Sequence, residues 1–164
     1  MVKIGAKAPD FRLQNQDDND VSLKEFAGKW VVLYFYPKDN TSGCTKEACD
    51  FTETLKDFEK LDAVVLGVSP DSTLSHRNFI EKQNLGITLL SDPDKKVLKA
   101  YGAWGIKKNY GKEYEGVIRS TYIISPEKKI SEIWSNVKVR TKRKNGEVRH
   151  VEVVKETLKE LQKK

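Results

Sequence analysis

The chain has 164 residues, a length that suits one domain with a sizeable core, so we expect a single domain over residues 1–164. Hydrophobic residues make up 38% and charged residues 33% of the sequence, a balance that excludes an intrinsically disordered chain. The formal net charge of +6 favours solubility, and we expect no nucleic-acid partner. Because the sequence has neither a signal-peptide leader nor a membrane-spanning apolar run, we expect a cytoplasmic protein without membrane association.

The first part of the chain predicts a short strand, a turn, a short helix and a buried strand. Residues 10–14 alternate in polarity like a strand, and the polar run 15–20 is typical of a turn. The segment 22–25 (Ser-Leu-Lys-Glu) fits a capping box that begins a short helix, which Gly28 ends. Residues 30–36 are β-branched or aromatic without a break, the pattern of a strand buried on both faces. We expect this strand at the centre of the fold.

A helix and a second buried strand follow. Apolar residues recur at helical spacing at Ala48, Phe51, Leu55 and Phe58, and residues 63–68 form another apolar run. With the preceding strand, they predict a βαβ unit that has parallel strands and a right-handed crossover.

The middle of the chain predicts two more helices with a strand between them. A helix over 71–83 is expected, with Asp71 or Ser72 as its cap, and a weak strand at 89–90. A further helix is predicted over 92–102, begun by Asp-Pro and ended by Gly.

The last part of the chain adds antiparallel strands and a closing helix. Strands are predicted over 118–125 and 130–134, joined by a turn at 126–129. Val151, Val154, Leu158 and Leu161 give one apolar face to a final helix. The pattern predicts an α/β fold with a central mixed β-sheet flanked by helices, an order that resembles thioredoxin-like folds.

The two cysteines, Cys44 and Cys49, lie five residues apart on the helix that follows the central strand. In a reducing cytoplasm such a pair more often indicates redox or metal chemistry than a structural disulfide. Cys44 is expected in the first turn of that helix, beyond the end of a central strand, where α/β sheets place their ligands. The unpaired N–H groups of a helix N-terminus favour a thiolate over a thiol. Cys44 is therefore the candidate nucleophile.

Three further residues are candidates for the surroundings of Cys44. The Thr41 hydroxyl, three residues earlier, is close enough in a tight loop to donate a hydrogen bond to the sulfur or to a bound oxygen. Pro37 stiffens the same loop and shields the site. Arg119 stands isolated among the apolar residues of 116–124, where a permanent cation is costly without an anionic partner. A thiolate is such a partner.

These residues carry a family resemblance. The segments 34–39 (Tyr-Phe-Tyr-Pro-Lys-Asp), 44–49 (Cys-Thr-Lys-Glu-Ala-Cys) and 119–122 (Arg-Ser-Thr-Tyr) resemble peroxiredoxins, most closely the bacterioferritin comigratory protein (BCP/PrxQ) group. The likeness starts at residues 8–11 (Ala-Pro-Asp-Phe) and spans nearly the whole chain. The Pro-x3-Thr-x2-Cys pattern is specific for that superfamily, and Cys-x4-Cys points to the subgroup with both cysteines on one helix.

The resemblance implies an antioxidant thiol-dependent peroxidase that reduces hydrogen peroxide and organic hydroperoxides. It implies that Cys44 attacks the peroxide to form a sulfenic acid, and that Cys49 resolves this as an intramolecular disulfide, which thioredoxin or a similar dithiol reduces. Pro37, Thr41 and Arg119 would form the peroxide pocket. The resemblance further implies a monomer that needs no metal and no other cofactor.

One further residue matches that family, and two features depart from its pattern. Glu47 matches a common family position, for which a supporting role is expected. Ser42 stands where many relatives have a second proline, which loosens the loop and leaves the reacting groups intact. Residues 137–150 are longer than the family norm, and Asn-Gly at 145–146 between alternating segments predicts an added C-terminal hairpin, to which no function is assigned.

The spacing of the cysteines has a mechanical consequence. On a regular helix, residues five apart have α-carbons roughly 8.6 Å from each other. A disulfide tolerates no more than about 7 Å. The segment from Cys44 to Cys49 must therefore unwind before the two sulfurs can join, and amide exchange in residues 43–50 should rise on oxidation.

Other interpretations remain open. The two cysteines also fit a structural buried pair. Zinc binding would need further ligands, and only His76 and His150 remain, each of which is interpreted as a solvated surface residue. Arg119 also fits a structural salt bridge, and Thr41 an ordinary loop hydroxyl.

Two alternative functions remain as well. The first is a thioredoxin-like disulfide oxidoreductase, against which the Cys-x4-Cys spacing argues. The second is a redox-responsive binding protein that uses the one basic cluster of the chain, for which salt-dependent retention on nucleic acid is the test. A solvated, charged hairpin is the preferred interpretation of that cluster, which comprises Lys138, Arg140, Lys142, Arg143, Lys144 and Arg149.

Overall fold

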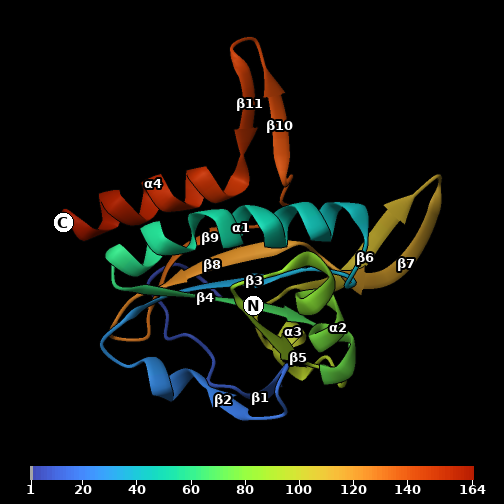
Figure 1. The fold of residues 1–164 in the computed structure, drawn as a ribbon, viewed down its shortest axis with the longest axis horizontal. Helices are drawn as coiled ribbons and strands as arrows, with labels where there is room; N and C mark the ends of the chain where they lie inside the picture. Colours follow the sequence, from blue (N-terminus) through green and yellow to red (C-terminus); the bar gives the residue numbers. More distant parts are fainter. Residues whose placement is uncertain (1) are drawn as a thin grey trace.

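The computed structural model describes residues 2–164 and shows a mixed sheet with helices on both faces (Figure 1). The helices are η1 (Leu23–Phe26), α1 (Ser42–Lys60), α2 (Thr73–Gln83), α3 (Lys96–Ala100) and α4 (His150–Gln162). The sheet has seven strands in the order β2-β1-β5-β4-β3-β8-β9, namely β1 (Arg12–Asn15), β2 (Asp20–Ser22), β3 (Trp30–Phe35), β4 (Ala63–Ser69), β5 (Thr88–Ser91), β8 (Ser120–Ile124) and β9 (Ile130–Trp134). Two separate hairpins comprise β6 (Trp104–Asn109) with β7 (Lys112–Val117), and β10 (Arg140–Arg143) with β11 (Gly146–Arg149).

Strand β3 lies at the centre of the fold, as its unbroken apolar sequence predicts. It pairs in parallel with β4 and antiparallel with β8, and β4 pairs in parallel with β5. The β3–α1–β4 segment is the predicted βαβ unit, and the predicted α/β fold with a mixed sheet is confirmed.

The core forms two layers because successive side chains of a strand point to opposite faces of the sheet. Val31, Leu33 and Phe35 of β3 belong to a cluster that also includes buried residues of α3 and the N-terminal segment. Val32 and Tyr34 belong to the other cluster, with buried side chains of α1, α2 and α4. The apolar faces predicted for α1 and for α4 therefore pack on the same side of the sheet.

The hairpin of β6 and β7 was not predicted. Its strands are rich in lysine and glutamate and are largely exposed, so they lack the alternation that marks a half-buried strand. Its two-residue loop, Tyr110-Gly111, has positive φ at both positions, 52° and 79°. Asparagine or aspartate is the usual signal at the first of these positions, and tyrosine is not.

Several predicted boundaries were wrong. The first strand, expected from residue 10, begins at Arg12, and the short strand β2 was not predicted. The helix expected from residue 92 begins only at Lys96, because the side chain of Asp92 turns the chain by accepting the N–H of Leu98 at 2.9 Å. The strand expected from residue 118 begins at Ser120, which leaves Arg119 just before the strand.

The C-terminal hairpin of β10 and β11 is present. Its loop is Lys144-Asn145, one residue earlier than the Asn-Gly pair suggests, because Gly146 already pairs with Arg143. The hairpin projects from the body of the molecule beyond α1 and α4 (Figure 1). Within residues 2–164, none of the helices has the length and apolar content needed to cross a bilayer.

Candidate active site

Cys44 lies in the first turn of α1, as the sequence predicts. The chain leaves β3 at Phe35, forms a loop, and enters α1 at Ser42 with Thr41 in extended conformation as the N-cap. The Cys44 side chain is buried, with 1% of the residue exposed. A thiol in this position faces the positive end of the helix dipole and is shielded from bulk water.

The pairing of β3 with β8 brings Arg119 to this thiol. Phe35 at the end of β3 is the partner of Ser120 at the start of β8, so the loop after β3 lies beside Arg119. The guanidinium Nη2 donates to the Cys44 Sγ at 3.2 Å. Two residues 75 positions apart in sequence therefore form one contact, which is the pairing that the isolated arginine predicted.

The same guanidinium also binds Glu47, one turn further along α1. Arg119 Nη1 donates to Glu47 Oε1 at 2.6 Å, and the Glu47 side chain is completely buried. Burial lowers the pKa of Arg119, but the negative charges of Glu47 and Cys44 outweigh it and the net shift is upward. Arg119 is thus held as a cation between a carboxylate and the sulfur.

Glu47 has an unusual protonation equilibrium. Its second oxygen, Oε2, is buried and has no hydrogen-bond partner among the described residues. Burial raises the pKa of Glu47 to about 7, and the charge of Arg119 opposes this rise. The Arg119–Glu47 ion pair is therefore sensitive to pH near neutrality.

Gly43 allows the close approach of Arg119 to α1. A Cβ at this position would lie 3.3 Å from Arg119 Nη2, the same nitrogen that donates to Cys44. Any larger residue would press on the guanidinium. Packing against Arg119 therefore explains the glycine at position 43, which the sequence alone did not reveal.

Thr41 and Pro37 lie in the loop between β3 and α1. The Thr41 hydroxyl donates to the carbonyl of Lys38 at 2.8 Å, so its single proton is directed into the loop. Pro37 lines a pocket of about 270 Å³ together with Arg119, Lys107 and Ile118. This pocket opens beside the guanidinium that contacts the sulfur.

A buried network fixes that loop to the body of the protein. Asp39 accepts from the Tyr36 hydroxyl at 2.6 Å and from the Ser75 hydroxyl at 2.8 Å, and its Oδ2 lies 2.7 Å from His76 Nδ1. The Asp39 N–H in turn donates to Asp71 Oδ2 at 2.8 Å. Asp39, Asp71 and His76 have the spacing of metal ligands, but these hydrogen bonds already occupy them. They form a structural anchor for the loop.

The interpretation of both histidines as surface residues was wrong. His76 has no exposed surface, and its Nε2 lies 2.9 Å from the carbonyl of Leu90. His150 is also buried, and its Nε2 lies 2.8 Å from the Thr121 hydroxyl. Burial and the nearby charge of Arg119 lower the pKa of His150 to about 4. Two isolated histidines give no periodic signal, so their tertiary partners could not be found from sequence.

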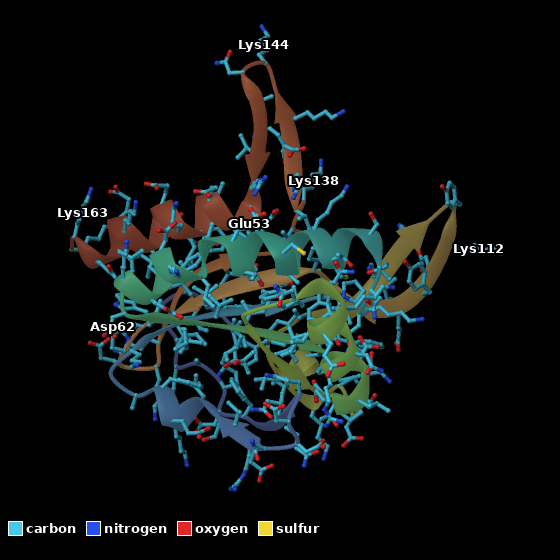
Figure 2. The ribbon with its side chains drawn as sticks, viewed as in Figure 1. Glu53, Asp62, Lys112, Lys138, Lys144 and Lys163 are labelled. Carbon is cyan, nitrogen blue, oxygen red and sulfur yellow. The ribbon has the colours of Figure 1, made fainter. Side chains whose placement is uncertain are left out.

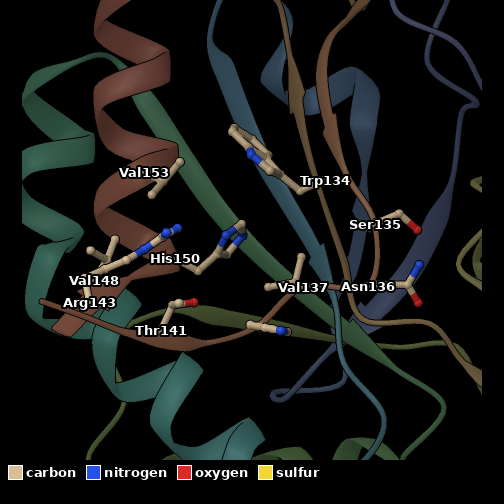
Figure 3. A pocket seen from close by; sticks show the side chains of 10 residues that line it. Trp134, Ser135, Asn136, Val137, Thr141, Arg143, Val148, His150 and Val153 are labelled. Atoms are coloured by element: carbon tan, nitrogen blue, oxygen red, sulfur yellow. The ribbon is translucent and has the colours of Figure 1, made fainter.

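His150 also borders a second pocket, of about 250 Å³, between the C-terminal hairpin, the end of β9 and the start of α4 (Figure 3). Arg143 and Val148 of the hairpin line it on one side and Trp134 on the other. The segment at Asn136 and Val137 lines both this pocket and the one beside Arg119. The two pockets are therefore adjacent on the surface.

Cys49 is half-buried on the same helix as Cys44, and both thiols are free. Burial and the negative charges of Asp50 and Glu53 raise the pKa of Cys49, while Arg140 opposes them. Because α1 is continuous from Ser42 to Lys60, helix geometry separates the two α-carbons by roughly 8.6 Å. The two thiols belong to one helix but are not placed to form a disulfide in this conformation.

The fold and this site together define a class of protein. A cysteine at a helix N-terminus after a central strand, held by a half-buried arginine and accompanied by a second thiol, is the arrangement of a thiol-based redox enzyme.

Comparison with known proteins identifies the family. The AhpC/TSA family matches residues 4–133. The "Peroxiredoxin Bcp" of Bacillus subtilis is 45% identical over 163 residues, which is 99% of both chains, and a putative Bcp peroxiredoxin of Helicobacter pylori is 51% identical over 139 residues, covering 85% of this chain and 91% of that one. The chain belongs to the AhpC/TSA family of peroxiredoxins, in the Bcp (PrxQ) group, and is a thiol-dependent peroxidase.

Solved structures agree with this assignment. Peroxiredoxin Q of Xanthomonas campestris superposes with a TM-score of 0.84 at 39% identity, covering 97% of this chain and 96% of that one. A PrxQ of Xylella fastidiosa superposes with a TM-score of 0.89 at 36% identity, covering 99% and 98%. The predicted family and thioredoxin-like fold are confirmed.

Proposed function

We propose that Cys44 is the residue that reacts with the peroxide and that Cys49 resolves the product. The observation that carries this proposal is the hydrogen bond of 3.2 Å from Arg119 to the buried Cys44 Sγ. A guanidinium at this position stabilises a thiolate and also lies where negative charge develops as the O–O bond breaks. Cys49 has no comparable cation on its sulfur among the hydrogen bonds of residues 2–164, which supports the assignment of the first step to Cys44.

The reaction has three balanced steps. The Cys44 thiolate attacks the nearer peroxide oxygen, forms a sulfenic acid, and releases an alkoxide or hydroxide that takes up a proton. The Cys49 thiol then displaces water from the sulfenic acid and forms a disulfide with Cys44. An external dithiol, thioredoxin or a similar protein, reduces the disulfide by exchange and restores both thiols.

Pro37 and Thr41 complete the proposed peroxide pocket. Pro37 forms part of the wall next to Arg119. The Thr41 hydroxyl donates to Lys38 in this conformation, so it must rotate away from that carbonyl to donate to a bound peroxide. Both hydrogen peroxide and organic hydroperoxides are proposed substrates. The pocket is open enough for an alkyl group, and the related Xanthomonas campestris protein has been crystallised in ligand complexes in a study of alkyl peroxide reduction.

The oxidised state requires a rearranged helix. Because a disulfide cannot span the helical distance, we propose that the first turns of α1 unwind after the sulfenic acid forms. We further propose a monomeric cytoplasmic enzyme that acts as a single domain.

The test is peroxide consumption by three proteins, each supplied first with a thioredoxin system and then with small thiols. Wild type should turn over with thioredoxin, Cys44→Ser should lose all activity, and Cys49→Ser should fail with thioredoxin. Full activity of Cys44→Ser would contradict the assignment of the nucleophile. Full thioredoxin-dependent activity of Cys49→Ser would contradict the proposed role of the second thiol.

A further inference from the structure

The C-terminal hairpin carries most of the net charge of the protein. Residues 138–149 contain six basic side chains and a single acidic one, Glu147, which gives +5 in a chain whose formal net charge is +6. The hairpin also lies outside the residues that match the AhpC/TSA family, which end at residue 133. Lys138 lies at its base and Lys144 at its tip, with the base next to α1 and Glu53 (Figure 2).

Two of its arginines are partly exposed but bind carboxylates of α1, which the sequence-based interpretation of a solvated hairpin did not include. Arg140 donates to both carboxylate oxygens of Asp50, from Nη2 at 2.7 Å and from Nε at 3.1 Å. Arg149 Nη1 lies 3.3 Å from Asp50 Oδ1 and 2.7 Å from Glu53 Oε2. We call these four residues, Asp50, Glu53, Arg140 and Arg149, the arginine clamp. One arginine comes from each strand of the hairpin; Arg140 binds Asp50, and Arg149 binds both Asp50 and Glu53 of α1.

Asp50 is the buried centre of the clamp. The Asp50 side chain is completely buried, and a buried carboxylate is costly unless cations and hydrogen bonds compensate it. The bidentate geometry of Arg140 provides that compensation with a fixed orientation. Phe51 and Phe58, further along α1, are also fully buried in the core. The helix from Asp50 onward is therefore tied both to the hairpin and to the sheet.

The clamp begins one residue after Cys49. The turns before it are held by the contacts of Arg119 with Glu47 and with the Cys44 sulfur, and by the burial of Cys44 and Ala48 in the core. Oxidation of Cys44 to a sulfenic acid adds an oxygen to the sulfur that accepts the Arg119 hydrogen bond, so this contact must rearrange. The clamp contains no reacting atom and keeps all its charges. Oxidation therefore weakens the attachment of α1 before Cys49 and leaves the attachment after Cys49 intact.

We infer that the arginine clamp sets the limit of unwinding, so that residues 43–49 open on oxidation while α1 from Asp50 onward stays folded. Cys49 then remains attached to the ordered residue Asp50. Its sulfur therefore stays close to Cys44, and the disulfide closes only a short loop. Arg140 and Arg149 are positioning residues for this second step. The inference rests on the proposed Cys44–Cys49 disulfide.

The experiment compares hydrogen exchange in the reduced and the disulfide forms by mass spectrometry. The clamp variant is Arg140→Gln/Arg149→Gln, and the control is Lys142→Gln/Lys144→Gln, which removes the same charge from the same hairpin. Among residues 2–164, neither control lysine has an ion pair. Intact mass after peroxide treatment establishes whether each protein has formed its disulfide, so a failure of the proposed function is seen separately.

In the disulfide forms of wild type and control, faster exchange should be confined to peptides within residues 43–49. In the disulfide form of the clamp variant, exchange over residues 51–58 should also rise, by at least about tenfold, whereas its reduced form should keep wild-type protection there. An increase in both redox states would mean that the clamp only stabilises α1, and it would overturn the inference. Identical profiles in the clamp variant and the control, or wild-type opening beyond Asp50, would overturn it as well.

A second variant guards against misfolding caused by an unpaired buried carboxylate. Asp50→Asn added to the two arginine substitutions removes that charge and keeps a side chain of similar size. Its disulfide form should show the same spread of exchange into residues 51–58. Exchange confined to residues 43–49 in this folded variant would contradict the clamp.

Discussion

At Cys44 the decisive group is one guanidinium that contacts both the cysteine sulfur and the carboxyl group of Glu47. Arg119 uses different nitrogens for the Cys44 sulfur and for Glu47, and a planar fork with fixed donors is what allows both contacts at once. A lysine has a single charged nitrogen and no such fork. The two contacts therefore depend on arginine itself and not on positive charge alone.

Arg119→Lys should slow the reaction of the reduced enzyme with hydrogen peroxide by about a hundredfold, because one aligned donor to the reacting atoms is lost. The second-order rate constant of peroxide reduction measures this. Arg77→Lys is the control, since Arg77 forms an exposed ion pair with Asp18 at 2.9 Å. A rate for Arg119→Lys equal to that of the control would show that charge alone suffices.

Gly43→Ala separates activity from stability. Alanine is the better helix former by about 1 kcal/mol, so the free energy of unfolding should not fall. The new Cβ would nevertheless lie 3.3 Å from Arg119 Nη2 and displace it from the sulfur, which should lower the rate constant for peroxide by about tenfold. Urea denaturation and peroxide kinetics on the same sample check both parts. Unchanged kinetics would mean that the guanidinium tolerates the displacement.

His150 should make stability depend on pH. Its pKa is about 4 in the folded protein against an ordinary 6.5, so between these values the unfolded chain binds a proton that the folded chain does not. Its contribution to stability is therefore present above pH 6.5 and lost as the pH falls towards 4, by about 3 kcal/mol in total. Glu47, with a raised pKa, has the opposite slope, since its contribution is lost as the pH rises through about 7.

Comparing wild type with His150→Gln isolates the histidine, because Glu47 is present in both. The difference in unfolding free energy between the two proteins should shrink as the pH is lowered from 7 to 4. Denaturation curves at several pH values give this difference, and a constant difference would show that His150 is not neutral in the folded state.

At the scale of elements, the loop between β3 and α1 owes its shape to Asp39. This buried carboxylate accepts from Tyr36 and Ser75 and lies against His76, which joins the loop to α2. The loop carries Pro37 and Thr41 and delivers the chain to α1, so its anchoring fixes where Cys44 begins the helix.

Asp39→Asn should lower the free energy of unfolding by about 3 kcal/mol. The two carboxylate oxygens of Asp39 both accept hydrogen bonds, whereas an amide has one oxygen and would turn an NH2 group toward one of these donors. Urea denaturation measures the change. Asp94→Asn, at an exposed position, is the matched control and should differ little from wild type. Equal stability of the two variants would contradict an anchoring role for Asp39.

Periodicity predicted the elements with a continuous apolar face and missed those that contribute only one or two residues to the core. The strands β3 and β4 and the helices α1 and α4 have apolar patterns that packing enforces, so their positions follow from the sequence. The hairpin of β6 and β7 is mostly exposed, with Val117 and Trp104 at its base against the core, and its Tyr110-Gly111 turn lacks the usual residues. The start of α3 depends on a contact between Asp92 and Leu98, which no pattern reveals.

At the scale of the whole molecule, the site is assembled by the sheet. The register of β3 against β8 joins Cys44 to Arg119, and the cost of an isolated buried arginine was enough to predict their association. The partners of Arg140, Arg149 and the two histidines could not be predicted, because each depends on where the C-terminal hairpin, α2 and α4 pack. The number of charges in the hairpin suggested a solvated surface. In the structure, Arg140 and Arg149 of the hairpin bind the helix that carries both cysteines.

The most direct test of the account is to trap the product of a single turnover. Reduced Cys49→Ser is mixed with one equivalent of hydrogen peroxide in the presence of a sulfenic-acid reagent, and the modified residue is located by peptide mass spectrometry. We expect an adduct on Cys44 in this variant, and in wild type a disulfide between Cys44 and Cys49 with little adduct. An unmodified Cys44 in Cys49→Ser, with peroxide consumed at the wild-type rate, would contradict it.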